Sequence, residues 1–252
     1  RRLSGSDIYF ISNQQPKQRI LNFSFRVKGM QPDLWNPLTG KVTALNNWST
    51  SGEKTFVQLQ MNEGEALFII FSRAGNPVYT RKLPRSPVKA DTITLNDNWK
   101  IQFDTAFGGP VKPLLSAALK SWTESANDSV KYYSGTVVYS NIIKVNKKVL
   151  KSSRVLLSID SLYNIAEITI NGKPCGTIWT PPFQLDISEA FKRGKNTIEI
   201  AVTNTWHNRL IGDQPLLPEK RITWTTAPFR LQGKPLEPAG ITGRVKMIVI
   251  GK

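Results

Sequence analysis

Residues 160–213 constrain the fold more than any other stretch of this 252-residue chain. Ile168 and Ile170 alternate with polar neighbours at a period of two, which is the pattern of a strand with one buried face. Asn171-Gly172 follows, a dipeptide that accepts the positive φ values of a tight hairpin turn. The sequence therefore predicts a β-hairpin, with a return strand directly after this turn.

The same stretch continues with a second set of strand signals. Pro181-Pro182 interrupts the return strand, and Ser188 is expected to cap one helical turn over residues 189–193. Residues 196–202 then alternate again, with apolar side chains at every second position. Strand, turn, strand, short helix and strand in this order indicate the closing half of an antiparallel β-sandwich.

The beginning of the chain has a similar pattern. Short alternating segments, of which residues 21–27 are the clearest, are separated by Gly and Pro turns at a spacing of roughly 8–12 residues. This spacing is typical of a small all-β sandwich, and we expect Trp35 in its core. Prolines among basic residues near positions 81–90 mark a boundary, because proline removes a ladder donor and restricts the backbone.

These patterns predict an all-β chain of two β-sandwich domains, residues 1–88 and 89–252. Helix should be scarce, at less than about a tenth of the residues, with one short helix over residues 114–119. Residues 245–250 are expected to form the last strand.

Composition supports a globular chain. Hydrophobic residues make up 40% of it and seven Trp are present, which argues against disorder. No apolar run approaches the ~20 residues of a membrane span. Cys175 is the one cysteine, so an intramolecular disulfide is excluded, and we expect it to fill core space. The chain begins at Arg1 without a Met, and we expect it to be part of a longer protein.

A formal charge of +16 raises the question of an anionic partner. Nucleic-acid-binding proteins concentrate such charge in a stripe, whereas the basic residues here are spread along the sequence. The densest run, with Lys144, Lys147, Lys148 and Lys151, is typical of a solvated loop or an edge strand, where lysine discourages strand pairing. A plain solvated surface is therefore favoured over attraction to acidic glycans, and both are favoured over nucleic-acid binding.

Several motifs resemble a known family. The order I-A-E-I-T-I-N-G-K…W-T-P-P-F-Q-L-D-I-S-E-A-F-K-R-G-K-N-T-I-E-I-A-V-T-N is similar to the galactose-binding-like jelly roll of many glycoside hydrolases, including the sugar-binding domain of family 2. The following T-N-T-W-H-N-R-L-I-G-D resembles more narrowly the C-terminal region of family 106 α-L-rhamnosidases. The resemblance extends to Y-F-I-S-N and D-L-W-N-P-L-T-G near the beginning, and so covers nearly the whole chain.

This resemblance carries a set of expectations. It implies that residues 89–252 are a galactose-binding-like jelly roll and that residues 1–88 follow a catalytic barrel, missing here, in the same polypeptide. The chain would then be a non-catalytic accessory region, and its partners would be that barrel and carbohydrate, with no nucleic acid or membrane. The parent enzyme would hydrolyse rhamnosyl linkages of a plant-type polysaccharide or glycoside, in the periplasm or outside the cell.

The residues themselves offer no catalytic candidate. Hydrolysis of a glycosidic bond usually needs two carboxyl groups about 5–10 Å apart, often at the strand ends of a barrel, and the chain lacks the strand–helix alternation of a barrel. Its acidic residues are expected to act as caps and turn acceptors. This group consists of Asp104, Glu124, Asp128, Asp160, Asp186 and Asp213. His207 is the only histidine, so no histidine metal site and no cofactor are predicted, although a jelly roll leaves room for a structural calcium.

Aromatic residues flanked by polar side chains are the candidates for contact with carbohydrate or with the barrel, because a Trp ring suits the apolar face of a sugar. These candidates are Trp179, Trp206, Asn208, Arg209, Asp213 and Trp224. For Trp179, packing in the core is the alternative.

Residues 206–213 show no alternation and are expected to form a loop, either at a domain interface or as a plug at one end of the jelly roll. Arg209 would anchor it, because a guanidinium can hold a carboxylate or several carbonyls at once. Leu210 and Ile211 would be buried, leaving Trp206 or Asp213 free to meet a partner.

Two other functions remain open on the sequence alone. The chain would also suit a free-standing carbohydrate-binding module. A basic β-protein that binds nucleic acid or mediates adhesion is the third, less favoured, interpretation.

Overall fold

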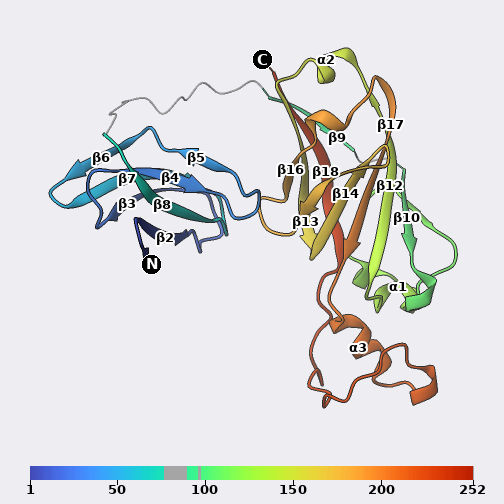
Figure 1. The fold of residues 1–252 in the computed structure, drawn as a ribbon. Coiled ribbons are helices and arrows are strands. Elements are labelled where there is room, and N and C mark those ends of the chain that lie inside the picture. The colour runs from blue at the N-terminus through green and yellow to red at the C-terminus, as the bar shows by residue number, and fades with distance from the viewer. Residues whose placement is uncertain (77–89, 96–97, 252) are drawn as a thin grey trace. The chain divides into compact units, whose positions relative to one another are not determined.

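The computed structural model describes residues 1–76, 90–95 and 98–251, and the chain divides into two compact units. The first unit begins at Arg1, and the second takes in residues 90–95, 98–179 and 183–251 of the described chain. Each unit is built from antiparallel β-sheets (Figure 1). The boundary predicted near residues 81–90 lies, apart from Ala90, outside the described residues, so the limits 1–88 and 89–252 stay a prediction.

The first unit is a sandwich of a five-stranded sheet, with the order β1-β2-β8-β4-β5, and a three-stranded sheet, with the order β3-β7-β6. Its strands are β1 (Arg2–Leu3), β2 (Ser6–Ser12), β3 (Arg19–Phe25), β4 (Met30–Trp35), β5 (Val42–Ala44), β6 (Trp48–Ser51), β7 (Lys54–Met61) and β8 (Ala66–Ala74). The amphipathic strand predicted over residues 21–27 is β3, which pairs with β7 along its whole length.

The core of the first unit contains Trp48 and not Trp35. Trp48 is 2% exposed, whereas Trp35 is 45% exposed. The prediction that Trp35 fills the core was wrong because Leu34, its neighbour on β4, packs inward, and alternation along a strand then turns Trp35 outward. On that outer face Trp35 lies directly across from Phe68 of β8.

The second unit is a larger sandwich, with a six-stranded sheet ordered β11-β10-β12-β17-β14-β15 and a four-stranded sheet ordered β16-β13-β18-β9. Its strands are β9 (Ala90–Thr94), β10 (Trp99–Phe103), β11 (Leu114–Ser116), β12 (Thr136–Val145), β13 (Arg154–Tyr163), β14 (Ile165–Ile170), β15 (Lys173–Ile178), β16 (Gln184–Asp186), β17 (Gly194–Thr203) and β18 (Gly240–Ile250).

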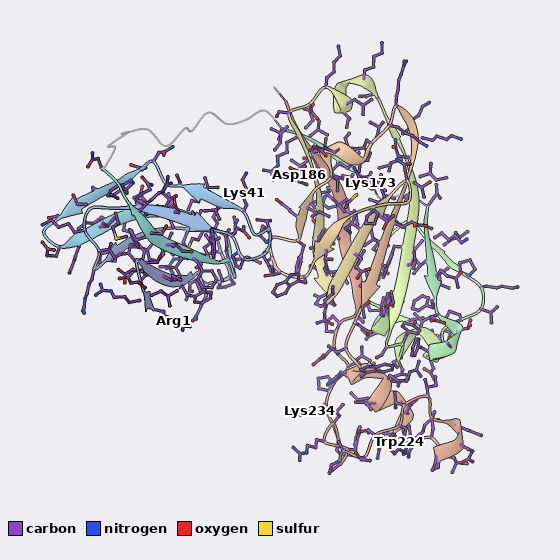
Figure 2. The ribbon with its side chains drawn as sticks, in the orientation of Figure 1. Arg1, Lys41, Lys173, Asp186, Trp224 and Lys234 are labelled. Atoms are coloured by element: carbon purple, nitrogen blue, oxygen red, sulfur yellow. The ribbon has the colours of Figure 1, made fainter. Side chains whose placement is uncertain are left out.

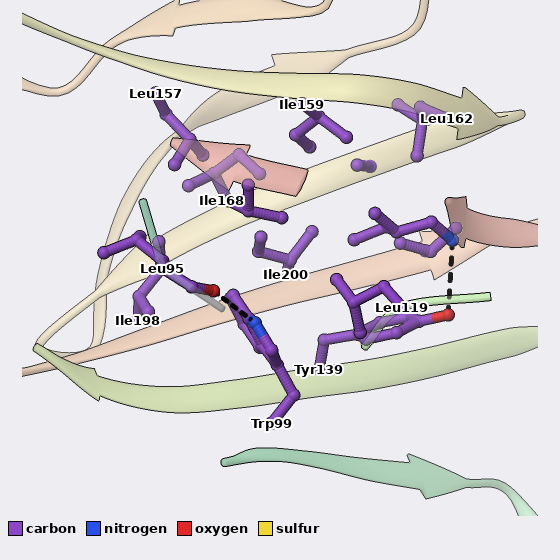
Figure 3. Close-up of a cluster of buried hydrophobic side chains, with 14 of the residues drawn as sticks. Leu95, Trp99, Leu119, Tyr139, Leu157, Ile159, Leu162, Ile168, Ile198 and Ile200 are labelled. Atoms are coloured by element: carbon purple, nitrogen blue, oxygen red, sulfur yellow. Dashed lines mark hydrogen bonds between the residues drawn. The ribbon is translucent and has the colours of Figure 1, made fainter. Parts of the chain in front are cut away.

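Apolar side chains from these two sheets meet in one core. Ile198 and Ile200 of β17 face Leu157 of the opposite sheet, and all three side chains are fully buried (Figure 3). Trp99 is also fully buried, and its Nε1 donates to the carbonyl of Leu95 at 2.6 Å. An unpaired polar atom in the core would cost stability, and this hydrogen bond lets the large Trp99 ring enter the core without that cost.

The predicted hairpin is confirmed. β14 and β15 pair antiparallel around Asn171 and Gly172, whose φ values are 54° and 77°. The return strand ends before Pro181-Pro182, and β17 takes in the alternating residues 196–202.

Two predicted helices were wrong. Residues 114–116 form β11, which pairs with the edge of β10, because a single helical turn in water is too unstable to compete with ladder hydrogen bonds. The turn predicted over residues 189–193 is only the 3-10 turn η3 (Ser188–Ala190), with Ser188 as its first residue and Ile187 at the cap position.

The all-β class is confirmed. In the described part of the chain the α-helices are α1 (Asp128–Lys131), α2 (Lys147–Leu150) and α3 (His207–Asp213), joined by the 3-10 turns η1 (Thr105–Phe107), η2 (Trp122–Glu124), η3 and η4 (Pro218–Lys220). None of these helices is long and apolar enough to cross a membrane.

Gly240, the first residue of β18, shows how tightly the second core is filled. It adopts a φ of 87°, and a Cβ there would come within 2.3 Å of Nε1 of Trp122 and 2.5 Å of the hydroxyl of Tyr139. These two buried groups are hydrogen-bonded to each other at 2.6 Å, and burial raises the pKa of Tyr139 to about 12.

We expect Gly240→Ala to lower the free energy of unfolding of the second unit by about 3 kcal/mol, from overpacking and the positive φ together.

Gly233→Ala is the matched control, because Gly233 has a φ of 68° but no atom within 4 Å of the added Cβ. It should lose only about 1–2 kcal/mol, the cost of the positive φ itself. Chemical denaturation followed by circular dichroism measures both losses, and equal losses would contradict this account of the packing.

Candidate functional site

Five of the six predicted site residues lie in one long connection, residues 204–239 between β17 and β18, which we call the excursion. It contains α3 and η4 and extends beyond one end of the second sandwich, opposite the end that carries α2 (Figure 1). Because β17 and β18 belong to different sheets, the excursion crosses from one layer of the sandwich to the other.

Arg209 and Asp213 form a buried ion pair on α3. Their residues are 6% and 2% exposed, and Nη1 of Arg209 lies 3.7 Å from Oδ1 of Asp213, four residues further along the helix. The guanidinium also donates from Nη2 to the carbonyl of Phe107 at 3.4 Å, and the Arg209 amide donates to Oγ of Ser134. Arg209 therefore ties α3 to the turn after β10 and to the loop before β12.

The carboxylate of Asp213 holds the next part of the excursion in place. Its Oδ2 accepts hydrogen bonds from the amides of Ile222 and Thr223, at 3.0 and 2.7 Å, and from the Thr223 hydroxyl at 2.7 Å. Oδ1 of Asp213 and Nε of Arg209 have no hydrogen-bond partner among the described residues. Asp213 is thus a structural acceptor and not the free carboxylate considered from the sequence.

Asn208 closes the excursion onto its other end. Its Nδ2 donates to the carbonyl of Glu237 at 2.8 Å, and its Oδ1 accepts from the Glu237 amide at 2.9 Å. His207 also contacts this segment, with Nε2 3.0 Å from the carbonyl of Pro235. Leu210 and Ile211, expected to be buried, are only partly so, and polar contacts carry much of the attachment.

The three tryptophan candidates are exposed. Trp224 is 87% exposed and directly follows the segment that Asp213 holds, so the ring projects from a fixed point (Figure 2). Trp206 is 47% exposed and packs edge-on against Phe107, with ring centroids 5.8 Å apart. Trp179, at 58% exposure, follows β15 outside the excursion and makes no ring contact in the described residues.

Four of the other five acidic residues act as local acceptors, and the fifth, Asp128, is the first residue of α1. Asp104 accepts from the Ala106 amide, Glu124 closes a capping box with Ser121, and Asp186 bonds Arg154 at 2.6 Å. The carboxylate of Asp160 accepts hydrogen bonds from the side chains of Lys246 and Arg244. Partial burial by itself would raise the pKa of Asp160, but these hydrogen bonds outweigh burial and lower it. Searched over the described residues, the chain brings together no three His, Cys, Asp or Glu that could hold a metal. The structural calcium considered above stays a prediction.

Two protein families match different parts of this chain. Residues 120–225 match the family described as the glycosyl hydrolase 2 galactose-binding domain-like family, and residues 1–49 match the alpha-L-rhamnosidase family. The resemblance inferred from the sequence is confirmed. This chain is a glycoside-hydrolase-related region with a galactose-binding-like domain.

Two relatives show how far the similarity extends. The solved structure of a rhamnosidase from Novosphingobium sp. PP1Y is 36% identical, covers 98% of this chain and 23% of its own chain, and superposes with a TM-score of 0.82. A protein of Formosa agariphila, provisionally named a beta-glucuronidase, is 35% identical over 84% of this chain and 19% of its own length. The chain therefore spans about a fifth of the length of these relatives.

The excursion lies largely within the galactose-binding-like match, which ends at residue 225, just after Trp224.

The buried ion pair between Arg209 and Asp213 gives a direct test of how α3 is held. We expect Asp213→Ala to lower the free energy of unfolding of the galactose-binding-like domain by about 3–5 kcal/mol, because it leaves Arg209 buried without a counter-charge. Chemical denaturation with a domain-specific signal measures the loss.

Asp186→Ala is the control for that experiment. Asp186 also pairs with an arginine, but its side chain is 45% exposed, so its loss should cost less than about 1 kcal/mol. If both variants lost the same small amount, α3 would not depend on the buried pair.

Proposed function

We propose that this chain is a non-catalytic accessory region of an α-L-rhamnosidase-like glycoside hydrolase, and that its galactose-binding-like domain contacts carbohydrate through the excursion. The observation that carries the proposal is the match to the Novosphingobium rhamnosidase, which takes in 98% of this chain but only 23% of that enzyme. The catalytic barrel would belong to the remaining part of the same polypeptide.

The roles of the acidic residues support a non-catalytic function. Both units are built from antiparallel sheets, and in the described residues no barrel of parallel strands presents carboxylates at one rim. Asp213, the most buried carboxylate of the excursion, accepts three hydrogen bonds from the protein itself. A general acid needs access to the glycosidic oxygen, and Asp213, at 2% exposure, has none.

The exposure of Trp224 supports carbohydrate contact. A ring of this size left 87% in water is unusual for a residue with only a packing role, and stacking on the apolar face of a sugar would cover it. Because Asp213 fixes the two residues before it, little backbone freedom is lost on binding.

The same proposal includes the setting. Both relatives carry names of enzymes that act on glycosides, a rhamnosidase and a beta-glucuronidase, so the substrate would be a rhamnosyl-containing polysaccharide or glycoside of plant type. The enzyme would work in the periplasm or outside the cell.

The absence of catalysis can be tested on the chain alone. We expect the purified 252-residue chain to release no aryl alcohol from an aryl α-L-rhamnoside above the uncatalysed rate, because two flanking carboxyls are required. A chromogenic assay measures release. Sustained turnover that a single Asp or Glu substitution abolishes would refute the proposal.

Carbohydrate contact has its own test. Trp224→Ala should lower the affinity of the chain for a rhamnose-rich polysaccharide by about tenfold, as measured by retardation in affinity gels. A tenfold loss corresponds to roughly 1.4 kcal/mol, the contribution of one stacking contact. The thermal stability of the variant should not change, because the side chain is 87% exposed.

Leu115→Ala, at a residue 79% exposed on β11 outside the excursion, is the control and should bind as the wild type does. If the wild-type chain is not retarded at all, carbohydrate contact is refuted and only the non-catalytic accessory role remains. Tight binding by a chain whose gene encodes no barrel would instead favour the free-standing binding module.

A further inference from the structure

The structure gathers positive charge at the end of the second sandwich that carries α2, opposite the excursion (Figure 1). Two segments far apart in sequence meet there, because Lys144 of β12 pairs directly with Lys195 of β17. We call the exposed basic side chains of these segments the α2-end cluster. Its members are Lys144, Lys147, Lys151, Lys192, Arg193 and Lys195.

The two segments that carry this cluster contribute no acid of their own. Residues 144–151 and 191–195 contain no Asp or Glu. In the described part of the chain none of the six side chains takes part in an ion pair, whereas Arg154, Arg244 and Lys246 of the same unit each have a carboxylate partner. Like charges opposite each other on neighbouring strands destabilise a sheet, so the Lys144–Lys195 pair is a cost to folding.

Protection of a sheet edge explains only part of this cluster. Lysine on an edge strand discourages pairing with other chains, which was one interpretation from the sequence. Lys144 and Lys195 fit it, because β10 pairs only with residues 137–140 of β12 and β14 only with residues 198–203 of β17. The other four members lie outside the strands, so edge protection does not account for their charge.

The cluster surrounds a hollow and stands on a rigid frame. The hollow has a volume of about 530 Å³ and is lined by Lys144, Lys147 and Arg193, with Val145, Asn146 and Gly194 between them. Asn196, 1% exposed, accepts from the Lys192 amide and donates to the carbonyls of Lys192 and Gly194. On the other side Asn146 accepts from the Val149 amide and holds the start of α2.

From this arrangement we propose that the α2-end cluster binds an anionic polysaccharide, with carboxylate or sulfate groups of the glycan entering the hollow between Lys144, Lys147 and Arg193. The inference rests on the proposed function only in taking the ligand to be a carbohydrate. A nucleic acid fits less well, because no exposed aromatic ring stands in these two segments for a base to stack on.

This site is distinct from the excursion. The two lie at opposite ends of one sandwich, so a polymer could contact both, with the cluster supplying charge attraction and Trp224 supplying stacking. Attraction of this kind depends steeply on salt, because binding releases counterions from the polymer.

The test compares two double variants of the 252-residue chain that change the net charge equally. Lys144→Glu with Arg193→Glu alters the cluster, and Lys112→Glu with Lys120→Glu alters two exposed lysines elsewhere in the same unit. Affinity for polygalacturonate, dextran sulfate, neutral dextran and duplex DNA is measured by gel retardation at several salt concentrations, and circular dichroism checks that each variant folds.

The wild-type chain should bind polygalacturonate or dextran sulfate but not neutral dextran, and the preferred polymer identifies the anionic group. The cluster variant should bind at least about tenfold more weakly, and the control variant less than about threefold more weakly. Lys144→Gln with Arg193→Gln should give an intermediate loss, which serves if the charge reversal does not fold.

Three results would overturn the inference: no retardation by either acidic polymer, equal weakening by both double variants, or tighter binding of DNA than of both acidic polymers. Failure of the proposed function would look different. In that case Trp224→Ala would leave binding to a rhamnose-rich polysaccharide unchanged while the cluster variant still lost its acidic ligand.

Discussion

The pairing of β12 with β17 determines most of the second unit. Ten successive residue pairs join the two strands, from Thr136 opposite Thr203 to Val145 opposite Gly194. In this register Ile198, Ile200 and Val202 all point to the same face, which is the core. A slip by one residue would turn all three toward water, at a cost of roughly 1.5–3 kcal/mol for each side chain. This register also fixes the two ends of the sandwich where the candidate surfaces lie.

The strands could be predicted because their signal is local. The alternation of Ile198 and Ile200 and the Asn171-Gly172 turn depend on neighbours in sequence, and the structure contains the strand and the hairpin they indicate. Tryptophan positions could not be predicted in the same way. Trp35 and Trp48 are equally apolar, and only the register of β4 against β8 turns Trp35 outward while Trp48 enters the core. Residues 114–116 likewise form a strand because β10 offers an edge, which no local pattern reveals.

The candidate site could be predicted only in part, because some of its signal is local and some depends on contacts between residues far apart in the sequence. The sequence pointed to residues 206–213 through their resemblance and their lack of alternation, but the expected loop was wrong, because residues 207–213 form the helix α3. Which of them are buried depends on distant partners. Asp213 is enclosed by residues 222 and 223, and Asn208 by residue 237, and such contacts cannot be read from spacing. Of the α2-end cluster, the sequence revealed only the run that contains Lys144, because Lys195 lies far away in the sequence and becomes its neighbour only through strand pairing.

The positions of these two surfaces have a physical consequence for how the domain can change. The excursion lies beyond one end of the β12–β17 ladder and the α2-end cluster lies at and beyond its other end, while the pairs between them carry the buried side chains. Substitutions at Trp224 or Lys144 therefore alter exposed groups and leave the core unchanged, so their effect on folding should be small. Arg209 and Asp213 are the exception, because they belong to the excursion and are buried at the same time. The excursion is consequently held by buried contacts at α3 and exposed at Trp224, and this arrangement would let a rigid sandwich present an aromatic ring to the proposed ligand.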